Sequence, residues 1–269
     1  FRYLVVRKSY KTDELLFNLV TTSPELPNFD LQKFASFLKD IFGNRLAGLL
    51  HTINDETGDR TIATSGSIEL VDGKDKIVEE LLGLNFEISM KSFFQTNPKC
   101  AEKLYSKVVE YVLEDKTKVD NTVVMDLFCG TGTIGQIVAS RSKNAKIVGV
   151  DIVASAIKDA QKNAKRNNIE GLQFYAADVG KFLIAHPEYQ NKIKTIILDP
   201  ARAGIAPKTL QKIIDLNADR MVYVSCNPAT QARDTELLSE AGYSIKKMSL
   251  VDQFPHTSHI ETVVLFERK

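Results

Sequence analysis

The sequence predicts an α/β protein, with a Rossmann-like domain on a seven-stranded mixed sheet and a smaller α/β domain before it. Three observations lead to this prediction. In the second half, near-continuous apolar strands alternate with helices, which is typical of a parallel sheet covered on both faces. The last two apolar strands are joined only by the short polar segment DQFPHTS, which favours an antiparallel hairpin. The length of 269 residues and the hydrophobic content of 43% are sufficient for one large domain or two modest ones.

Composition and charge exclude several classes of protein. The formal net charge is +1, so a polyanionic partner would bind through local patches rather than a global positive field. Cys100, Cys129 and Cys226 form no C-x-x-C pair, which argues against a disulfide framework, a zinc ribbon or a four-cysteine iron–sulfur cluster. We expect a cytoplasmic monomer, since neither a leader nor the ~20 apolar residues that cross a bilayer are present. Because the chain opens inside an apparent strand, it looks like a fragment whose missing N-terminus could carry another module or a targeting signal.

Residues 1–90 are predicted to form the smaller domain. Period-two apolar patterns predict its strands, and an amphipathic pattern predicts a helix at 31–42. Asn28 and Asp30 are both placed to cap that helix. The predicted strands are 2–7, 14–21, 46–54, 61–71 and 85–89.

The second domain is predicted at 91–269 and opens with a helix. Asn97 is placed as the N-cap of that helix and Pro98 as its first residue. Strands and helices then alternate until two closing strands complete the sheet. The predicted strands are 122–128, 146–152, 172–178, 195–200, 221–227, 243–251 and 259–268, and the predicted helices are 134–141, 153–167, 207–217 and 229–241. Methyltransferases use this layout, and ligands of such sheets bind at the carboxyl ends of the strands.

A glycine-rich loop follows the first strand of this domain. Its glycines satisfy G-x-G-x-x-G between a strand and a helix, a spacing that also occurs in NAD sites; they are Gly130, Gly132 and Gly135. Aspartates stand at or just before the carboxyl ends of the first four strands: Asp126, Asp151, Asp178 and Asp199. Four carboxylates at one edge disfavour a pyrophosphate and favour a ligand with an ammonium and a sulfonium group, such as S-adenosylmethionine. Capping of a helix or a turn explains any single aspartate equally well, but it does not explain all four.

Cys226 follows the fifth strand in the segment VYVSCNP. The adjoining Asn227-Pro228 predicts a turn that holds the sulfur out of the core, at the same edge as Asp199. A thiolate there can add to carbon 6 of uracil and make carbon 5 nucleophilic enough to accept a methyl group. The alternative is a small buried hydrophobic residue, which accounts for Cys100 and Cys129 but not for a cysteine at the ligand edge.

The fourth strand ends in Asp199-Pro200-Ala201-Arg202. Amino-group methyltransferases typically carry a polar residue, two prolines and an aromatic residue here, and this sequence lacks the aromatic residue. We favour Asp199 at the cofactor or the target base and Arg202 toward a phosphate. The alternative is a turn in which Arg202 pairs with a carboxylate.

Glu261 is the candidate base for removing the proton from carbon 5. Strand alternation places His259, Glu261 and Val263 on one face, and a glutamate at the start of an apolar strand is costly unless it has a partner or a function. His259 could orient or polarise this carboxylate. The alternative is an exposed edge or turn residue. A metal site at His256 and His259 is disfavoured because two histidines supply too few ligands.

These motifs together resemble those of a known family. FFQTNP, DLFCGTGTIG, VDIV, DPARAG, VSCNP and FPHTSHIETVVLF, in this order, closely resemble the RNA uracil-5-methyltransferases that modify ribosomal and transfer RNA. The resemblance covers the chain from about Phe93 to its end, and the first domain looks like that family's central domain. It implies a class I methyltransferase that uses S-adenosylmethionine, with Cys226 as nucleophile and Glu261 as base. The positions that it implies for cofactor contact are Gln95, Phe128, Gly130, Thr133, Asp151, Asp178 and Asp199.

The chain also departs from the family pattern. Ala201 stands where a second proline is usual, and Asp178 and Thr133 stand where asparagine is frequent. The family's N-terminal β-barrel RNA-binding module is not in this chain, nor are the cysteines of the iron–sulfur cluster that some members carry near it.

RNA would have to present its uracil outside a duplex, in a loop or flipped into a pocket. Phe93 and Phe94 are candidates to stack on the base, and residues 1–90 are expected to contribute RNA contacts. Basic residues gather on one predicted helix and near it: Lys158, Lys162, Lys165, Arg166, Arg141, Lys143 and Lys146. Such groups are more often solvated faces than RNA contacts.

Three functions therefore remain open. The leading one is formation of 5-methyluridine in rRNA or tRNA through a covalent Cys226 adduct. The second is an S-adenosylmethionine-dependent methyltransferase with another target, such as RNA cytosine or a small molecule. The third is a non-catalytic RNA-binding or folding module, which the presence of both Cys226 and Glu261 disfavours.

Overall fold

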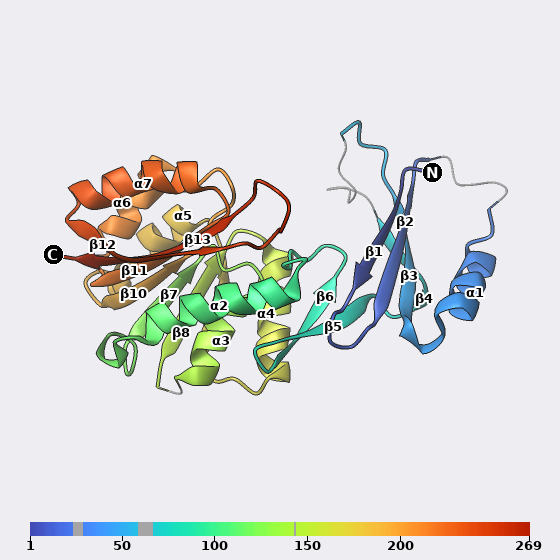
Figure 1. Ribbon diagram of the computed structural model, residues 1–269, viewed down its shortest axis with the longest axis horizontal. Helices are drawn as coiled ribbons and strands as arrows, with labels where there is room; N and C mark the ends of the chain where they lie inside the picture. The colour runs from blue at the N-terminus through green and yellow to red at the C-terminus, as the bar shows by residue number, and fades with distance from the viewer. Residues whose placement is uncertain (24–28, 59–66, 143) are drawn as a thin grey trace. The chain divides into compact units, whose positions relative to one another are not determined.

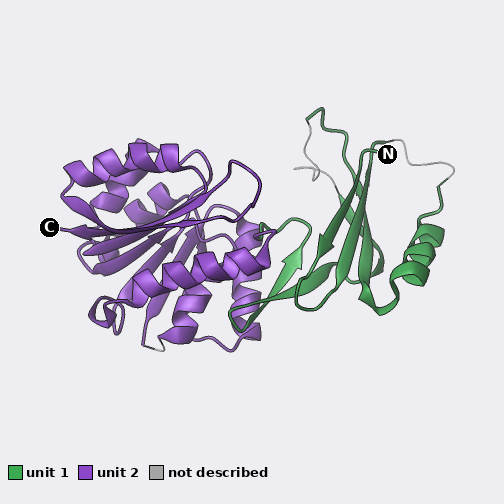
Figure 2. Cartoon of the chain, in the orientation of Figure 1, with its two compact units in different colours: residues 1–94 green, residues 95–269 purple. Residues whose placement is uncertain are grey.

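A computed structural model of the chain describes residues 1–23, 29–58, 67–142 and 144–269 (Figure 1). Two compact units divide the chain, the first Phe1–Phe94 and the second Gln95–Lys269 (Figure 2). No helix within the described ranges is long and apolar enough to span a membrane.

The first unit is built on a four-stranded sheet in the order β1-β2-β3-β4. Its strands are β1 (Tyr3–Lys8), β2 (Leu15–Thr21), β3 (Leu46–Ile53) and β4 (Ile68–Gly73). β2 and β3 pair in parallel, so the chain crosses over between them through helix α1 (Leu31–Phe42). Asp30 caps this helix by accepting a hydrogen bond from the Lys33 amide, as the sequence predicts. Asn28, the other candidate cap, and residues 61–66 of the predicted strand 61–71 lie outside the described residues.

A hairpin of β5 (Lys76–Leu81) and β6 (Leu84–Ser89) completes the first unit. The sequence predicts β6 but not β5. The inward-facing residues of β5 include Glu79, which is 1% exposed and accepts hydrogen bonds from the amides of Tyr10 and Lys11. A carboxylate among inward-facing residues interrupts the apolar alternation that marks a strand, so the pattern was not recognised.

The second unit carries a seven-stranded mixed sheet, as predicted, in the order β12-β13-β11-β10-β7-β8-β9. Its strands are β7 (Val123–Leu127), β8 (Lys146–Asp151), β9 (Leu172–Ala176), β10 (Ile193–Leu198), β11 (Arg220–Ser225), β12 (Tyr243–Val251) and β13 (Glu261–Arg268). β13 is antiparallel to both of its neighbours, β11 and β12. The last strand in chain order therefore lies inside the sheet rather than at its edge.

Helices cover both faces of this sheet (Figure 1). On one face lie α2 (Pro98–Leu113), α3 (Thr133–Arg141) and α4 (Ala154–Arg166), and on the other lie α5 (Val179–Ala185), α6 (Pro207–Ile214) and α7 (Pro228–Glu240). Asn97 caps α2 and Pro98 is its first residue, which confirms the sequence prediction. α5 was not predicted, because it has only seven residues and follows directly on Asp178, which was assigned to the preceding strand.

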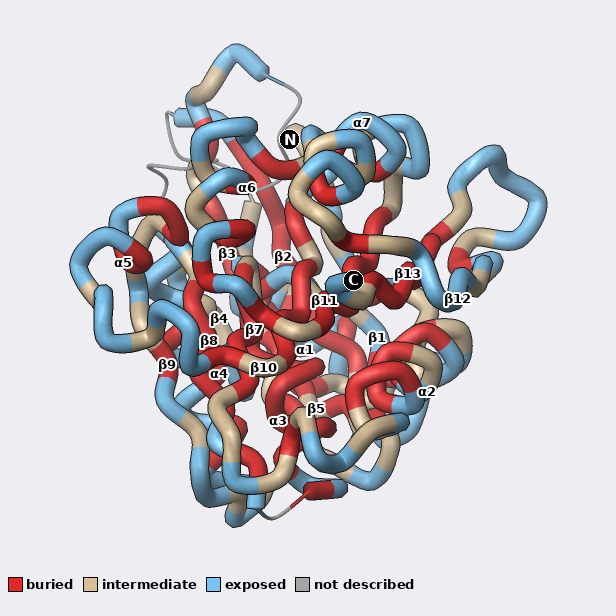
Figure 3. Tube along the Cα trace, turned by 90° about the vertical axis from the view of Figure 1, so that its left-hand side faces the viewer, coloured by how far each residue is buried: buried red, intermediate tan, exposed pale blue. Residues whose placement is uncertain are grey.

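The central strands of the sheet are buried on both faces, as their red segments in Figure 3 show, whereas the edge strand β12 is largely exposed. β10 and β11 are buried along almost their whole length, and the main core packs their side chains against α5 and α6. Polar side chains therefore reach a ligand mainly where these strands end. The register aligns Leu198 with both Leu127 and Tyr223, so the carboxyl ends of β7, β10 and β11 lie at one edge.

Candidate active site

The carboxyl edge of the sheet in the second unit gathers most of the predicted site residues. Asp151 ends β8, Asp199 follows β10, and the glycine-rich loop follows β7. Cys226 follows β11, which pairs directly with β10 and runs two residues further. The thiol therefore stands at the end of the strand beside the one that carries Asp199.

Cys226, just beyond the end of β11, and Glu261, at the start of β13, lie at the same level. The antiparallel ladder between β11 and β13 pairs Val224 with Val263 and Ser225 with Thr262. The next residues outward are Cys226, one residue beyond β11, and Glu261, the first residue of β13. Glu261 is 5% exposed, which excludes the alternative of an exposed turn residue. The sheet register therefore brings the predicted nucleophile and the predicted base together.

The Asn227-Pro228 turn is the predicted link from Cys226 into a helix. Asn227 is the N-cap of α7, accepting a hydrogen bond from the Ala229 amide, and Pro228 is the first helical residue. The Asn227 side chain also donates to the backbone carbonyl of Arg202 at 3.1 Å. This contact ties the turn beside the thiol to the loop after Asp199.

Burial and like charge perturb the acidic groups at this edge. Burial raises the pKa of Asp199 to about 8, with a further contribution from the charges of Glu261 and Asp126. Burial and the charge of Asp151 raise the pKa of Asp126 to about 7, against the hydrogen bond that Asp126 accepts from the Gly135 amide. Burial also raises the pKa of Glu261. A carboxylate with a raised pKa is a better proton acceptor near neutral pH.

The same surroundings disfavour the thiolate of Cys226. Burial raises the pKa of this thiol, the charges of Glu261 and Asp199 raise it further, and the charge of Arg202 lowers it. Any cation that binds among these carboxylates would shift all of these pKa values downward.

The glycine-rich loop owes two of its glycines to packing. A side-chain carbon on Gly132 would lie 2.5 Å from the ring of Phe174, and one on Gly135 would lie 2.8 Å from Asp126 Oδ2. Gly130 differs, because a side-chain carbon there would meet nothing within 4 Å. Its φ of +53° favours glycine, and the open space beside it leaves backbone accessible to a ligand.

Asp151 organises this loop through both of its oxygens. It accepts hydrogen bonds from the Gly130 amide at 2.9 Å and from the Val153 amide at 2.8 Å. Each carboxylate oxygen can accept a second hydrogen bond, so Asp151 keeps capacity for ribose hydroxyls.

The other predicted cofactor positions have structural partners of their own. Asp178 is the N-cap of α5, accepting from the Lys181 amide at 2.9 Å, so the capping explanation describes its observed contact. The hydroxyl of Thr133 lies 3.1 Å from that of Thr131. Phe128 packs against the main core, and its backbone has a φ of +64°. Gln95 is 9% exposed and shares a hydrogen bond with Tyr105.

The predicted substrate residues differ in their exposure. Phe93 is 74% exposed, whereas Phe94 packs in the core of the first unit with its ring 6.1 Å from that of Phe86. Arg202 is exposed. His259 is exposed and precedes β13, so the predicted start of that strand is wrong by two residues. A turn at Phe254–Thr257 precedes His259. The rings of Phe254 and His259 pack edge-on, with their centroids 6.4 Å apart.

The predicted basic residues are exposed on α4 and at the end of α3. Lys158, Lys162, Lys165 and Arg166 project from α4, and Arg141 and Lys146 lie at the end of α3 and the start of β8. Lys143 lies outside the described residues.

Sequence reasoning missed three residues at this edge: Tyr105, Gln231 and Thr262. Tyr105 is 6% exposed on α2, and besides burial, the charges of Asp199, Glu261 and Asp126 raise its pKa. It lies among the apolar positions of an amphipathic helix, so its sequence context indicates only a core residue. Gln231 and Thr262 contact each other across elements far apart in sequence, which no local pattern reveals.

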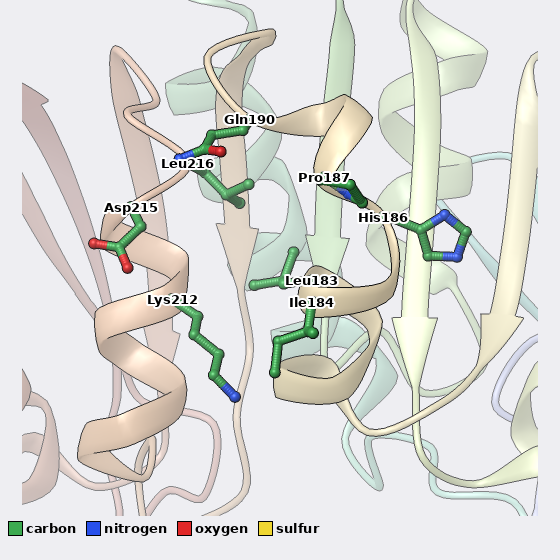
Figure 4. A pocket seen from close by; sticks show the side chains of 8 residues that line it. All are labelled: Leu183, Ile184, His186, Pro187, Gln190, Lys212, Asp215 and Leu216. Atoms are coloured by element: carbon green, nitrogen blue, oxygen red, sulfur yellow. The ribbon is translucent and has the colours of Figure 1, made fainter.

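A pocket of about 240 Å³ lies elsewhere, around the ends of α5 and α6 (Figure 4). Its lining residues are Leu183, Ile184, His186, Pro187, Gln190, Lys212, Asp215 and Leu216. None of the predicted site residues lines it, so it is separate from the candidate active site.

The donor set at the carboxyl edge fits S-adenosylmethionine. A cluster of carboxyl groups with raised pKa values suits a ligand with two positive charges, and Gly130 leaves open backbone beside Asp151. The second unit is a class I methyltransferase, the fold that uses S-adenosylmethionine. Three features define it: the order of the strands in the sheet, the glycine-rich loop after β7 and the acidic residue at the end of β8.

Comparison with known proteins identifies the family. Residues 60–269 match the family of tRNA (uracil-5-)-methyltransferases, and the chain belongs to that family. It is 45% identical over 269 residues to an uncharacterized RNA methyltransferase of Clostridium tetani, covering all of this chain and 56% of the relative. A relative from Clostridium acetobutylicum is equally similar, with the same coverage. The chain therefore spans about half the length of the curated relatives it matches.

A solved structure agrees with this assignment. The chain is similar to the tRNA (uracil-54, C5)-methyltransferase of Pyrococcus abyssi in complex with S-adenosyl-L-homocysteine, with a TM-score of 0.76 and 30% identity. That likeness covers 98% of this chain and 59% of the other. TYW2 of Pyrococcus horikoshii is similar with a TM-score of 0.61, 17% identity and coverage of 99% and 90%, a likeness of fold alone.

Proposed function

We propose that this chain carries the catalytic part of an S-adenosylmethionine-dependent methyltransferase that forms 5-methyluridine in rRNA or tRNA. The observation that carries the proposal is the adjoining position of Cys226 and Glu261, one residue beyond the Ser225–Thr262 pair. Uracil methylation needs a nucleophile at carbon 6 and a base at carbon 5, which are neighbouring atoms of one ring. Family membership supports the same reaction.

Cys226 begins the proposed reaction. Its thiolate adds to carbon 6, forming a C–S bond, and the electron pair of the 5,6 double bond moves into an enolate whose nucleophilic carbon is carbon 5. The predicted cofactor residues would hold S-adenosylmethionine, which would supply a methyl group to carbon 5 and leave as S-adenosylhomocysteine. The positive charge of Arg202 favours the thiolate that the first step requires.

Glu261 completes the proposed reaction. Its carboxylate removes the proton from carbon 5, the C–H electron pair restores the 5,6 double bond, and the C6–S bond breaks to release Cys226 as a thiolate. The raised pKa of Glu261 suits it to accept this proton near neutral pH. Asp199 is proposed at the cofactor or the target base, and Arg202 at a phosphate.

RNA recognition is proposed to use an unpaired or flipped uridine. Phe93 is the better stacking candidate because 74% of its surface is exposed, whereas Phe94 is occupied in packing. Residues 1–90 are proposed to add RNA contacts, and we propose a cytoplasmic monomer. His259, in the exposed loop before Glu261, is proposed on the substrate side rather than as a partner in the strand.

The proposal is tested by incubating the protein and S-adenosylmethionine with rRNA and tRNA transcribed with 5-fluorouridine. A fluorine at carbon 5 cannot leave as a proton does, so we expect a covalent complex on denaturing electrophoresis, mapping to the peptide of Cys226. Cys226→Ala should abolish the band, and Cys100→Ala should not. Trapping by 5-fluorocytidine RNA alone would identify cytosine as the target. Intact cofactor binding with no trapping by either RNA would contradict the proposal.

A further inference from the structure

Gln231 joins the strand of the nucleophile to the strand of the base. We propose that Gln231 is a positioning residue that acts through Thr262 to hold Cys226 and Glu261 at a fixed separation. The role rests on the proposed function, in which these two side chains serve neighbouring ring atoms. In this role Gln231 does not contact the side chain of Cys226 or of Glu261. It acts through the Tyr223 carbonyl and the Thr262 hydroxyl, which lie on the adjoining strands.

The amide of Gln231 uses both of its ends between two strands. Gln231 extends from α7 and is 5% exposed. Its Nε2 donates to the backbone carbonyl of Tyr223 on β11 at 3.0 Å. Its Oε1 lies 2.6 Å from the hydroxyl of Thr262 on β13. One buried side chain therefore bridges adjacent strands.

The Thr262 hydroxyl extends this bridge to the last rung of the ladder. It lies 3.1 Å from the carbonyl of Ser225 as well as 2.6 Å from Gln231 Oε1. A hydroxyl has a single proton, so the two acceptors share it, and the shorter distance favours Gln231. Ser225 directly precedes Cys226, and Thr262 directly follows Glu261. The bridge therefore acts one residue inward from both site residues.

A buried glutamine does not satisfy both ends of its amide by default. Gln136 on α3 is fully buried, and its Nε2 donates to the carbonyls of Thr131 and Ala160, but its Oε1 has no hydrogen-bond partner within the part of the chain that the structure describes. An unsatisfied buried amide oxygen costs roughly 1–3 kcal/mol. Gln231 differs because both its Nε2 and its Oε1 have partners at the end of the β11–β13 ladder.

The helix that carries Gln231 is anchored independently. Asp234, one turn further along α7, accepts hydrogen bonds from the Tyr223 hydroxyl at 2.7 Å and from the Ile205 amide at 2.9 Å. Loss of the Gln231 amide should therefore leave α7 in place. The substitution removes the hydrogen bonds that connect β11 to β13 through Gln231, close to the ends of both strands. Strand ends fray more readily than strand centres.

The first test measures the electrostatic contact between Cys226 and Glu261 without RNA or cofactor. The rate of Cys226 alkylation is followed against pH by peptide mass mapping, which gives the pKa of the thiol. The charged groups that act on this thiol are Glu261, Asp199 and Arg202. Since Glu261 raises the pKa of Cys226, Glu261→Gln should lower it. In a Gln231→Met background, we expect that shift to fall to less than half.

Matched variants separate positioning from folding. Gln231→Met keeps the length of the side chain and removes both hydrogen bonds, and Thr262→Val removes the hydroxyl. Thr262→Ser keeps the hydroxyl and should restore the full shift. Thr235→Val is the control, since the Thr235 hydroxyl donates back to the Gln231 carbonyl within α7. An equal shift in the parent and the Gln231→Met background would overturn the proposal.

A second test uses the reaction itself. For Gln231→Met, we expect the single-turnover methylation rate to fall about 10–100-fold, the scale of a small misplacement of reacting groups. KM for RNA and the affinity for S-adenosylmethionine should stay unchanged. Failure of the parent protein to trap fluorinated RNA would refute the proposed function, while the alkylation result would still decide whether Gln231 couples the two side chains. Trapping by the parent together with an unchanged Glu261-dependent shift would refute only the role of Gln231.

Discussion

Ser225 and Thr262 form the outermost pair of the ladder between β11 and β13, and each directly adjoins a residue of the candidate active site. Glu261 opens a paired strand and Cys226 lies one residue beyond one, so backbone pairing limits the separation between the proposed base and the proposed nucleophile. Groups on or next to paired strands are held more rigidly than groups on long loops, which suits the proposed reaction at two neighbouring atoms.

Replacement of Glu261, the proposed base, should stall the proposed reaction after methyl transfer. In Glu261→Gln, the amide cannot accept the proton on carbon 5, so the C6–S bond cannot be expelled. We expect a methylated, protein-linked RNA to accumulate with unmodified substrate. Denaturing electrophoresis with radiolabelled methyl groups measures it, and Cys226→Ala should show no such band. Normal multiple turnover by Glu261→Gln would remove Glu261 from the role of base.

Cofactor affinity should rise with pH between about 6 and 8. Asp199 and Asp126 have pKa values of about 8 and about 7, so each gains its negative charge in this interval. A ligand with a sulfonium and an ammonium group prefers the ionised forms, by up to about tenfold per pH unit for each group that titrates. Calorimetry in two buffers of different ionisation enthalpy should detect proton release on binding. An affinity independent of pH would argue against these carboxylates as the cation site.

Asp199→Asn should stabilise the free protein while weakening cofactor binding. Burial raises the pKa of Asp199 from its usual 3.8 to about 8, so between these two pH values the folded state keeps a proton that the unfolded state has released. The free energy of unfolding is therefore highest at low pH and falls as pH rises from the lower pKa to the higher one. At pH 8, we expect the variant to melt several degrees higher, since roughly 1 kcal/mol corresponds to about 2–4 °C at this size. At pH 4 the two proteins should melt at similar temperatures.

Two glycine substitutions in the same loop should have different effects. Gly132→Ala places a methyl group 2.5 Å from the Phe174 ring, at a φ of +68°, and we expect a loss of roughly 2–4 kcal/mol in unfolding free energy. Gly130→Ala meets no atom within 4 Å and should cost only the backbone strain of about 1–2 kcal/mol. Its larger effect should be on cofactor affinity. Chemical denaturation and a binding titration on both variants measure the difference.

The two neighbouring phenylalanines should separate substrate binding from folding. Phe93 is 74% exposed, so Phe93→Ala should leave stability almost unchanged and weaken RNA binding by roughly 1–3 kcal/mol if the ring stacks on a base. Phe94→Ala should destabilise the first unit by about 3 kcal/mol, since its ring packs in that core against Phe86. Thermal melting and RNA titration distinguish the two. Equal RNA affinity of Phe93→Ala and the parent would exclude stacking by Phe93.

Apolar strands and helix caps were predictable from sequence because their signals are local. Asn97 and Pro98 begin α2 where the sequence places them, and Asp30 caps α1. β5 was missed because Glu79 is buried by hydrogen bonds from a distant loop, which sequence periodicity does not reveal.

Some candidate site residues could be proposed from sequence because they follow recognisable strands, as Asp199 and Cys226 do. The sequence also places these two at one edge, but it does not reveal the contacts between elements. Gly132, in the loop after β7, has no room for a side chain because of Phe174 on β9. The hydrogen bond between Gln231 and Thr262 joins α7 to β13, which is the last strand of the chain. Both depend on tertiary structure. The register that aligns Cys226 with Glu261 likewise appears only when β13 is paired.

The position of β13 between β11 and β12 has a consequence for how activity arises during folding. β12 and β13 pair as an antiparallel hairpin, and the sheet closes when β13 of that hairpin pairs with β11. Until that pairing, the thiol of Cys226 stands beside an open strand edge without Glu261 opposite it. Pairing of segments distant in sequence is a slow event in folding. During refolding, cofactor binding to the other strands should precede methyl transfer, and the appearance of catalytic activity should mark closure of the sheet.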